Sequence, residues 1–249
     1  MKNKIKSVIL FVVVDLLITS CAKDNYSGPS VTFKGALLYN GVDTVFVQQS
    51  TGHDINAAKV YFYLYEPGWQ KTYTTPIRVV VDASGTFSSV LFPSTYKLVM
   101  PLNNGPFIPK PDTTIVELTG NQTMDIPVTP YYLVRNLATS LSTTDSTVTA
   151  NFKIDKIVTD ANAKTIATAQ LYISRTIIVD GSNYIANSNL SGAAITDISN
   201  VVLKAKIPDL NKIVGLGIST TQKQFFVRVG IRINGSTEVF SPVKTVTLP

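Results

Sequence analysis

Short runs of alternating apolar and polar residues, separated by turn-forming residues, fill the chain from Val31 onwards. This two-residue period is typical of half-buried β-strands, because successive side chains of a strand point to opposite faces of the sheet. Val, Ile and Thr are abundant and only 15% of the 249 residues are charged, which favours strands over helices. The pattern predicts an all-β protein with strands at residues 31–39, 59–65, 77–82, 85–92, 95–100, 113–118, 123–128, 133–141, 146–158, 165–175, 201–207, 224–233 and 238–246.

The predicted strands form two groups, with Thr129, Pro130 and Tyr131 between them. A proline cannot donate a hydrogen bond to a β-ladder, so its position between strand-like runs favours a hinge. Short strands at regular spacing are typical of sandwiches and small barrels. We therefore expect two β-sandwich domains in tandem, at residues 31–129 and 130–249.

Two stretches indicate which kinds of sandwich these are. Residues 82–98 contain a Gly-x-Phe strand, a turn with Pro93 and a Thr-Tyr-x-Leu strand, and they resemble the transthyretin-like, carboxypeptidase regulatory-like module. Ser94 stands where that module usually has glycine. Residues 225–243, two apolar runs around an Asn-Gly turn, resemble the last hairpin of a fibronectin type III or immunoglobulin-like sandwich.

The N-terminal residues have the organisation of an export signal. Three lysines within the first six residues precede a mostly apolar run, residues 8–18, and Cys21 follows closely. The run is shorter than the roughly 20 apolar residues that a membrane-spanning helix needs. Asp15, near its end, is an exception to the pattern, because a carboxylate is costly in an inserting helix.

A cysteine at the expected cleavage point resembles the lipoprotein box of bacteria. The resemblance implies that residues 1–20 are a signal peptide, that Cys21 is lipidated, and that the protein is held on a membrane by this lipid. Residues 21–30 are polar and end in turn formers, so we expect a short tether. Within them, Lys23-Asp24 resembles the charged signal that sends lipoproteins of the Bacteroidota to the outside of the outer membrane.

Charge patterning gives no sign of nucleic-acid binding. The formal net charge is +6, and removal of residues 1–20, with three lysines and one aspartate, lowers it to +4. The remaining Lys and Arg residues stand singly between polar neighbours. We expect no nucleic-acid partner.

Catalytic chemistry finds little support in the sequence. His53 is the only histidine and Cys21 is the only thiol, whereas hydrolytic triads need a base and zinc sites need several His or Cys ligands. Glu66, Glu117 and Glu238 could pair for glycoside hydrolysis, but most β proteins carry such acids at strand ends. We expect no catalytic residue, no metal site and no cofactor.

Aromatic residues are the stronger feature. The two-residue period places Tyr61, Tyr63 and Tyr65 on one face of a strand, and Trp69 and Tyr73 follow in the next loop. Such rings bind sugars by packing against their C–H faces. Two interpretations stay open: a ligand platform that includes Tyr65, Trp69 and Tyr73, or a face covered by a second sheet or by the other domain. Phe107, in a proline-rich loop, is a further candidate for ligand contact.

Three short motifs, at Thr44, Thr113 and Ser146, each follow an aspartate and resemble the acceptor motif for O-glycosylation in exported proteins of the Bacteroidota.

Segments spread over the mature chain resemble an uncharacterised family of Bacteroidota surface lipoproteins. Members pair a transthyretin-like module with an immunoglobulin-like one, and they are usually encoded beside the outer-membrane transporter and glycan-binding lipoprotein of polysaccharide-utilisation loci. The segments that carry the resemblance are residues 20–26, 64–69, 104–107, 112–113 and 126–131.

This resemblance implies a monomeric, non-enzymatic surface protein that binds polysaccharide or scaffolds the transporter and its lipoprotein. The alternative is a structural or adhesive module that binds partner proteins and no sugar.

Overall fold

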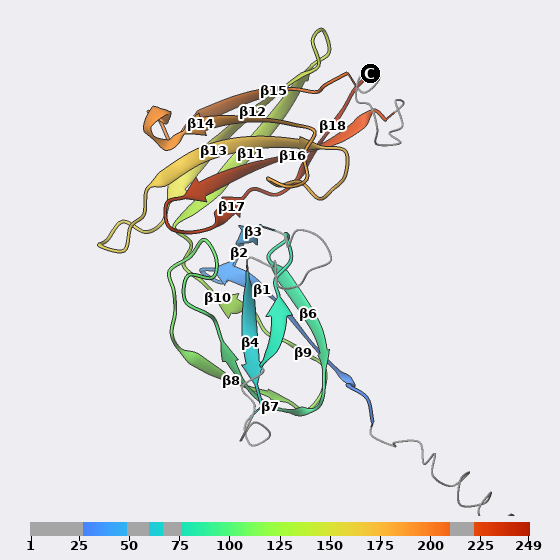
Figure 1. Cartoon of the computed structure of the whole chain (residues 1–249), viewed down its shortest axis with the longest axis vertical. Coiled ribbons are helices and arrows are strands. Elements are labelled where there is room, and N and C mark those ends of the chain that lie inside the picture. Colours follow the sequence, from blue (N-terminus) through green and yellow to red (C-terminus); the bar gives the residue numbers. More distant parts are fainter. Residues whose placement is uncertain (1–26, 49–59, 67–75, 210–221) are drawn as a thin grey trace, which may run out of the picture.

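The computed structural model describes residues 27–48, 60–66, 76–209 and 222–249. Their architecture is two all-β units in tandem, as the alternation predicts, with one 3₁₀ turn at Gly192–Ala194 (Figure 1). Within the described residues, no helix has the length and apolar character needed to cross a membrane.

The first unit is a sandwich of two sheets. The first sheet has strand order β10-β1-β2, with β6 and β9 also paired to β1, and the second has order β5-β4-β7-β8. Their bounds are β1 (Val31–Tyr39), β2 (Asp43–Thr44), β6 (Thr86–Leu91), β9 (Gln122–Thr123), β10 (Ile126–Pro127), β5 (Ile77–Val80), β4 (Tyr61–Tyr65), β7 (Ser94–Val99) and β8 (Thr113–Leu118).

Three aromatic rings from both sheets meet in the core of this unit. Phe33 of β1 and Phe87 of β6 both contact Phe62 of β4, with ring centroids 6.3 and 4.9 Å away. All three rings are at most 3% exposed. Burial of this apolar area holds the two sheets together, at about 1.5–3 kcal/mol for each large side chain.

The second unit also packs two sheets. One has strand order β11-β12-β15, and the other has order β14-β13-β16-β17-β3, with β18 paired to β16. Their bounds are β11 (Tyr132–Ser142), β12 (Thr147–Lys156), β15 (Val201–Lys206), β14 (Ala186–Ser191), β13 (Ile166–Ser174), β16 (Gln224–Ile233), β17 (Glu238–Phe240), β18 (Lys244–Thr247) and β3 (Phe46–Val47).

The last strand in that sheet, β3, comes from the first half of the chain. It pairs with β17 through Val47 opposite Val239 and Phe46 opposite Phe240. The first unit therefore contributes an edge strand to the sheet of the second. The second unit sits at the end of the first that is far from the N-terminal segment (Figure 1).

Several observed strands differ from the predicted ones. Residues 238–246 form two strands rather than one, because Pro242 has no amide hydrogen to continue the ladder. Residues 123–128 form only the short strands β9 and β10, each paired in parallel with β1. The strand β14 was not predicted, because its sequence is rich in Asn and Ser.

Candidate ligand-binding face

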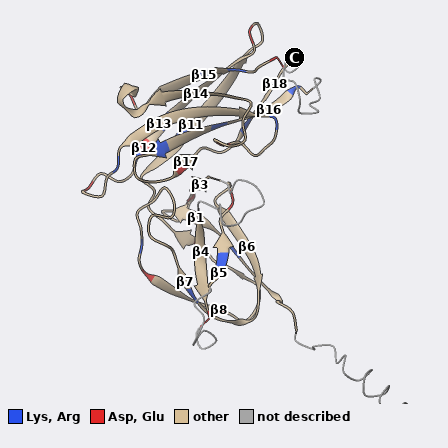
Figure 2. Cartoon of the chain, viewed as in Figure 1, with Lys and Arg blue, Asp and Glu red and all other residues tan. Residues whose placement is uncertain are grey.

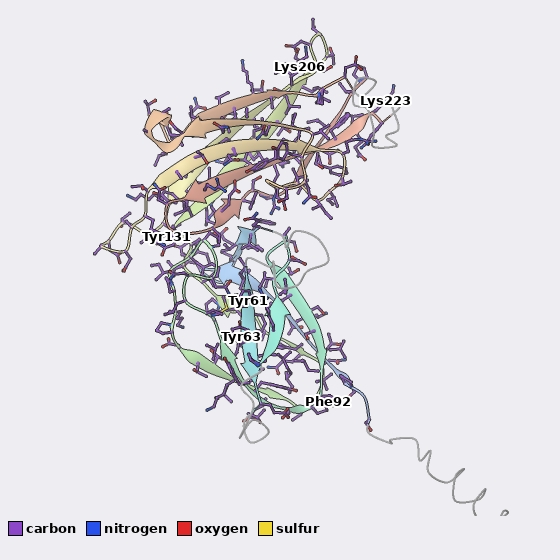
Figure 3. All side chains as sticks on the ribbon, in the orientation of Figure 1. Tyr61, Tyr63, Phe92, Tyr131, Lys206 and Lys223 are labelled. Carbon is purple, nitrogen blue, oxygen red and sulfur yellow. The ribbon has the colours of Figure 1, made fainter. Side chains whose placement is uncertain are left out.

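The predicted alternation of β4 is present in the structure. Phe62 and Leu64 are fully buried, whereas Tyr61, Tyr63 and Tyr65 are half-buried and point to the other face. The second sheet of the sandwich lies on the Phe62 side, because Phe62 contacts Phe33 and Phe87 there. Among the described residues, no second sheet therefore covers the tyrosines, which project from the outer face of the β5-β4-β7-β8 sheet (Figure 3).

The three tyrosine rings form a continuous row. The centroids of Tyr61 and Tyr63 are 5.3 Å apart, and those of Tyr63 and Tyr65 are 6.2 Å apart. The ring planes meet at 63° and 67°, so each ring presents its edge to the next. This geometry is favourable for the aromatic quadrupoles and gives a stepped rather than a flat surface.

A guanidinium group lies at one end of the row. The Arg78 Cζ atom is 3.7 Å from the centroid of the Tyr61 ring, which is the geometry of a cation–π contact. Arg78 is directly opposite Tyr63 in the β4–β5 ladder, so both side chains share the outer face. The hydrogen bond with Tyr63 and partial burial raise the pKa of the Tyr61 hydroxyl above its usual value, although the charge of Arg78 opposes this shift.

Strands β7 and β8 extend this face on the other side of β4. Lys97 is opposite Tyr65, and Ile115 is opposite Lys97. Both side chains are exposed, Ile115 by 53%. We call the set Tyr61, Tyr63, Tyr65, Arg78, Lys97 and Ile115 the tyrosine face. It combines aromatic surface with cationic hydrogen-bond donors.

Two of the predicted contact residues, Trp69 and Tyr73, lie outside the described residues, as does His53. Tyr65 lies at the end of β4 that leads towards them.

Phe107 is elsewhere in the first unit. Its ring is only 5% exposed and lines a cleft of about 180 Å³ with Leu98 and Ile126. Leu98 is opposite Leu64 in the ladder and points inwards with it. The structure therefore does not bring Phe107 to the tyrosine face, but places it at the core side of the same sheet.

Asn104 is a residue that the sequence reasoning missed. It is 7% exposed, and its side chain exchanges hydrogen bonds with the backbone of Tyr61, accepting from the amide and donating to the carbonyl. This contact fixes the 101–107 loop to the start of the tyrosine row. The Asn-Asn-Gly sequence at residues 103–105 is typical of a turn, but it does not indicate this partner.

Charged groups elsewhere include one cluster, in which Arg135 pairs with Asp43 and Asp155, and Lys153 pairs with Asp155. Outside this cluster, Lys and Arg residues stand singly over both units (Figure 2). Over the described ranges, His, Cys, Asp and Glu side chains form no group of three that could hold a metal ion.

The two halves of the chain match two family models. Residues 31–129 match the model described as "Protein of unknown function (DUF3823) N-terminal domain", and residues 132–245 match "Domain of unknown function (DUF3823_C)". The chain belongs to the DUF3823 family. This confirms the resemblance to an uncharacterised Bacteroidota family.

Solved structures of the DUF3823 family share the fold. The chain is 29% identical to a family member from Parabacteroides merdae, with a TM-score of 0.71 over 90% of this chain and 100% of that one. A member from Bacteroides ovatus is 28% identical, with a TM-score of 0.70 over 89% of this chain and 100% of that one.

A Bacteroides uniformis protein described as "a putative carbohydrate binding protein" is 15% identical, with a TM-score of 0.65 over 89% of this chain and all of its own, and shares the fold. Among curated proteins, none matches the chain.

Proposed function

We propose that this DUF3823 protein is a non-enzymatic, lipid-anchored protein of the outer-membrane surface, which binds glycan through the tyrosine face. The observation that carries the proposal is the row of three half-exposed tyrosine rings on one side of a rigid sheet. Tyrosine gives large contact area at low entropic cost, and its hydroxyl can also bond to a sugar hydroxyl. Sites built on strands are positioned more rigidly than sites on loops.

The polar neighbours of the row suit the same ligand class. Arg78 and Lys97 flank the tyrosines from the two adjacent strands and carry only hydrogen-bond donors. Sugar hydroxyls and ring oxygens accept such bonds, while the tyrosine rings contact the apolar side of the sugar. The Bacteroides uniformis protein that shares the fold makes polysaccharides the first ligand class to test.

The anchor defines where such binding would act. In this proposal Cys21 carries the lipid, Lys23-Asp24 directs the protein to the cell exterior, and the partners are a polysaccharide, an outer-membrane transporter and its glycan-binding lipoprotein. The protein acts as a monomer that holds polysaccharide close to the transporter. Buried acyl chains contribute about 0.8 kcal/mol per methylene, which keeps the protein on the membrane.

Affinity electrophoresis of the mature chain in gels containing a panel of polysaccharides tests this function. We expect at least one polysaccharide to retard the wild-type protein, and Tyr63→Ala, Tyr65→Ala and Trp69→Ala to reduce the retardation. Tyr184→Ala is the matched control, because Tyr184 is 44% exposed but lies in the second unit.

Two results would contradict glycan binding at this face. One is equal retardation of the wild type and of both tyrosine variants. The other is migration unaffected by every polysaccharide, and co-purification with an outer-membrane transporter in that case would support the scaffold function instead.

A further inference from the structure

Two apolar side chains are exposed at one end of the first unit. Val90 is 59% exposed and Phe92 is 48% exposed, whereas Leu91 between them is 3% exposed. Val90 points to the outer side of β6, because side chains alternate along a strand, and the exposed Phe92 is the first residue after this strand. Single exposed apolar residues are common, so the position of this pair matters more than its existence.

The pair lies beside the point at which the N-terminal segment leaves the domain. Leu91 is opposite Val31, the first residue of β1, and the Ser30 amide donates a hydrogen bond to the Leu91 carbonyl at 2.9 Å. Val90 is opposite Thr32 in the same ladder. Figure 3 shows Phe92 at this end of the molecule, near the start of the described chain.

The chain between Cys21 and the start of the first unit is short. Ser30 is nine residue steps from Cys21, with eight residues between them, and nine fully extended steps span at most about 32 Å. A lipid on Cys21 would therefore keep this end of the first unit within that distance of the membrane. The second unit and the C-terminal end lie at the opposite end of the molecule (Figure 1).

Two backbone positions of the turn that carries Phe92 present no unsatisfied polar group. The Phe92 carbonyl accepts a hydrogen bond from the Tyr96 hydroxyl at 2.9 Å, and Pro93 has no amide hydrogen. Backbone groups without partners are costly in an apolar environment, so this turn is suited to contact with lipid.

We propose that Phe92 and Val90 insert into the lipid surface that holds Cys21, so that the first unit stands on the membrane and the second unit points away. This inference rests on the lipid anchor of the proposed function. Two side chains bury too little area to recruit a protein by themselves, but the anchor already supplies the association. A tether this short gives the pair a high effective concentration at the surface, so weak insertion is enough to set the orientation.

Tryptophan fluorescence of the full lipidated chain in vesicles tests the orientation. Trp69, the only tryptophan, is first replaced by Phe, and Phe92→Trp is then introduced as the single reporter. In phosphatidylcholine–phosphatidylglycerol vesicles we expect a blue-shifted emission, and at least a two-fold loss of intensity when the acyl chains are brominated. Ile177→Trp is the matched control, because Ile177 is 68% exposed but belongs to the second unit.

Three outcomes decide the proposal. Quenching of the residue 92 reporter, with none at residue 177, supports it, and Val90→Trp should then behave like Phe92→Trp. Equal emission from the 92 and 177 reporters on vesicle-bound protein overturns it and leaves the anchor intact. If the wild-type chain does not float with vesicles, the anchor of the proposed function fails and the inference fails with it.

Discussion

Arg135 of the second unit binds Asp43 of the first through two parallel hydrogen bonds. Nη1 and Nη2 donate to the two carboxylate oxygens at 2.5 and 2.6 Å. Arg135 Nε also donates to Asp155 at 3.2 Å, so one guanidinium joins carboxylates from both units. Bidentate pairs of this kind add geometric specificity as well as energy.

Loss of this pair should destabilise the protein measurably. Both side chains are about 30% exposed, so solvent screens the interaction, and we expect Asp43→Asn to lower the free energy of unfolding by about 1 kcal/mol. Urea denaturation measures the change. Asp112→Asn is the matched control: Asp112 pairs with Lys110 at 3.5 Å with both side chains over 60% exposed, so its substitution should change little.

The same pair predicts a pH dependence. The hydrogen bonds from Arg135 hold the pKa of Asp43 below its usual value, although burial opposes this. A carboxyl with a lowered pKa stabilises the fold above the pKa of the unfolded chain, near 4, and loses that contribution as the pH falls through the folded pKa. The stability difference between wild type and Asp43→Asn should therefore be constant at neutral pH and shrink below about pH 4. A difference that persists unchanged at pH 2.5 would contradict this origin.

Glu238 should make the protein less stable as the pH rises. It is 5% exposed, and burial raises its pKa to about 7, although the hydrogen bond from Tyr172 opposes the shift. Below about pH 4.5 the Glu238 carboxyl is neutral in both the folded and the unfolded chain, and it does not reduce stability. Between pH 4.5 and 7 it ionises more readily in the unfolded chain, so the free energy of unfolding falls over this range. Over this range we expect the free energy of unfolding of Glu238→Gln to rise by up to about 3 kcal/mol relative to that of the wild type.

Urea denaturation at pH 4.5, 6 and 8 measures this gain. Glu117→Gln, at an exposed position of β8, is the control and should follow the wild-type profile. Parallel profiles for Glu238→Gln and wild type would show that Glu238 does not cause the pH dependence.

Phe62 and Tyr63, which are adjacent in β4, should respond differently to substitution by alanine. Phe62 is fully buried between Phe33 and Phe87, so Phe62→Ala should cost about 3–5 kcal/mol of stability. Tyr63 is half-buried on the outer face, so Tyr63→Ala should cost clearly less while reducing glycan retardation. Thermal denaturation and affinity electrophoresis of the same two proteins separate packing from binding. Comparable destabilisation by both substitutions would indicate that the tyrosine row is a packing surface.

Gly35 should tolerate no side chain. A Cβ atom there would lie 1.9 Å from the Met124 carbonyl oxygen and 2.9 Å from the Phe87 ring, so β1 and the β9–β10 segment would have to separate. We expect Gly35→Ala to destabilise the protein by more than about 2 kcal/mol. Gly120→Ala, where nothing lies within 4 Å, should be close to neutral. Equal unfolding midpoints for the two variants would contradict this prediction.

Much of the fold could be predicted because burial imposes a local period. The predicted strands 31–39 and 224–233 have the same bounds as β1 and β16. In β1 buried side chains alternate with more exposed ones, and β16 contains a run of buried residues. The strand β14 could not be predicted, because its Asn and Ser residues carry no such period and it exists through its ladder with β13. The two-residue strand β3 likewise depends on a partner, β17, that is remote in the sequence.

The site was predictable only in part for the same reason. The two-residue period placed Tyr61, Tyr63 and Tyr65 on one face, because that period acts within a single strand. Arg78, Lys97 and Ile115 join them through the strand order β5-β4-β7-β8, which no local pattern encodes. The sequence predicts Phe107 as a ligand contact in a proline-rich loop, but a bridge to Pro130 and its own apolar surface hold it inside.

Because β3 pairs with β17, backbone hydrogen bonds join the two parts of the chain that lie before and after residue 130. A separately produced second unit would expose the free edge of β17, which is a template for aggregation. A separately produced first unit would leave Phe46 without its cross-strand neighbour. The two halves are thus better treated as one mechanical element, in which a force applied to the sheet of the second unit is transmitted through the backbone hydrogen bonds of the β3–β17 pair to the first unit.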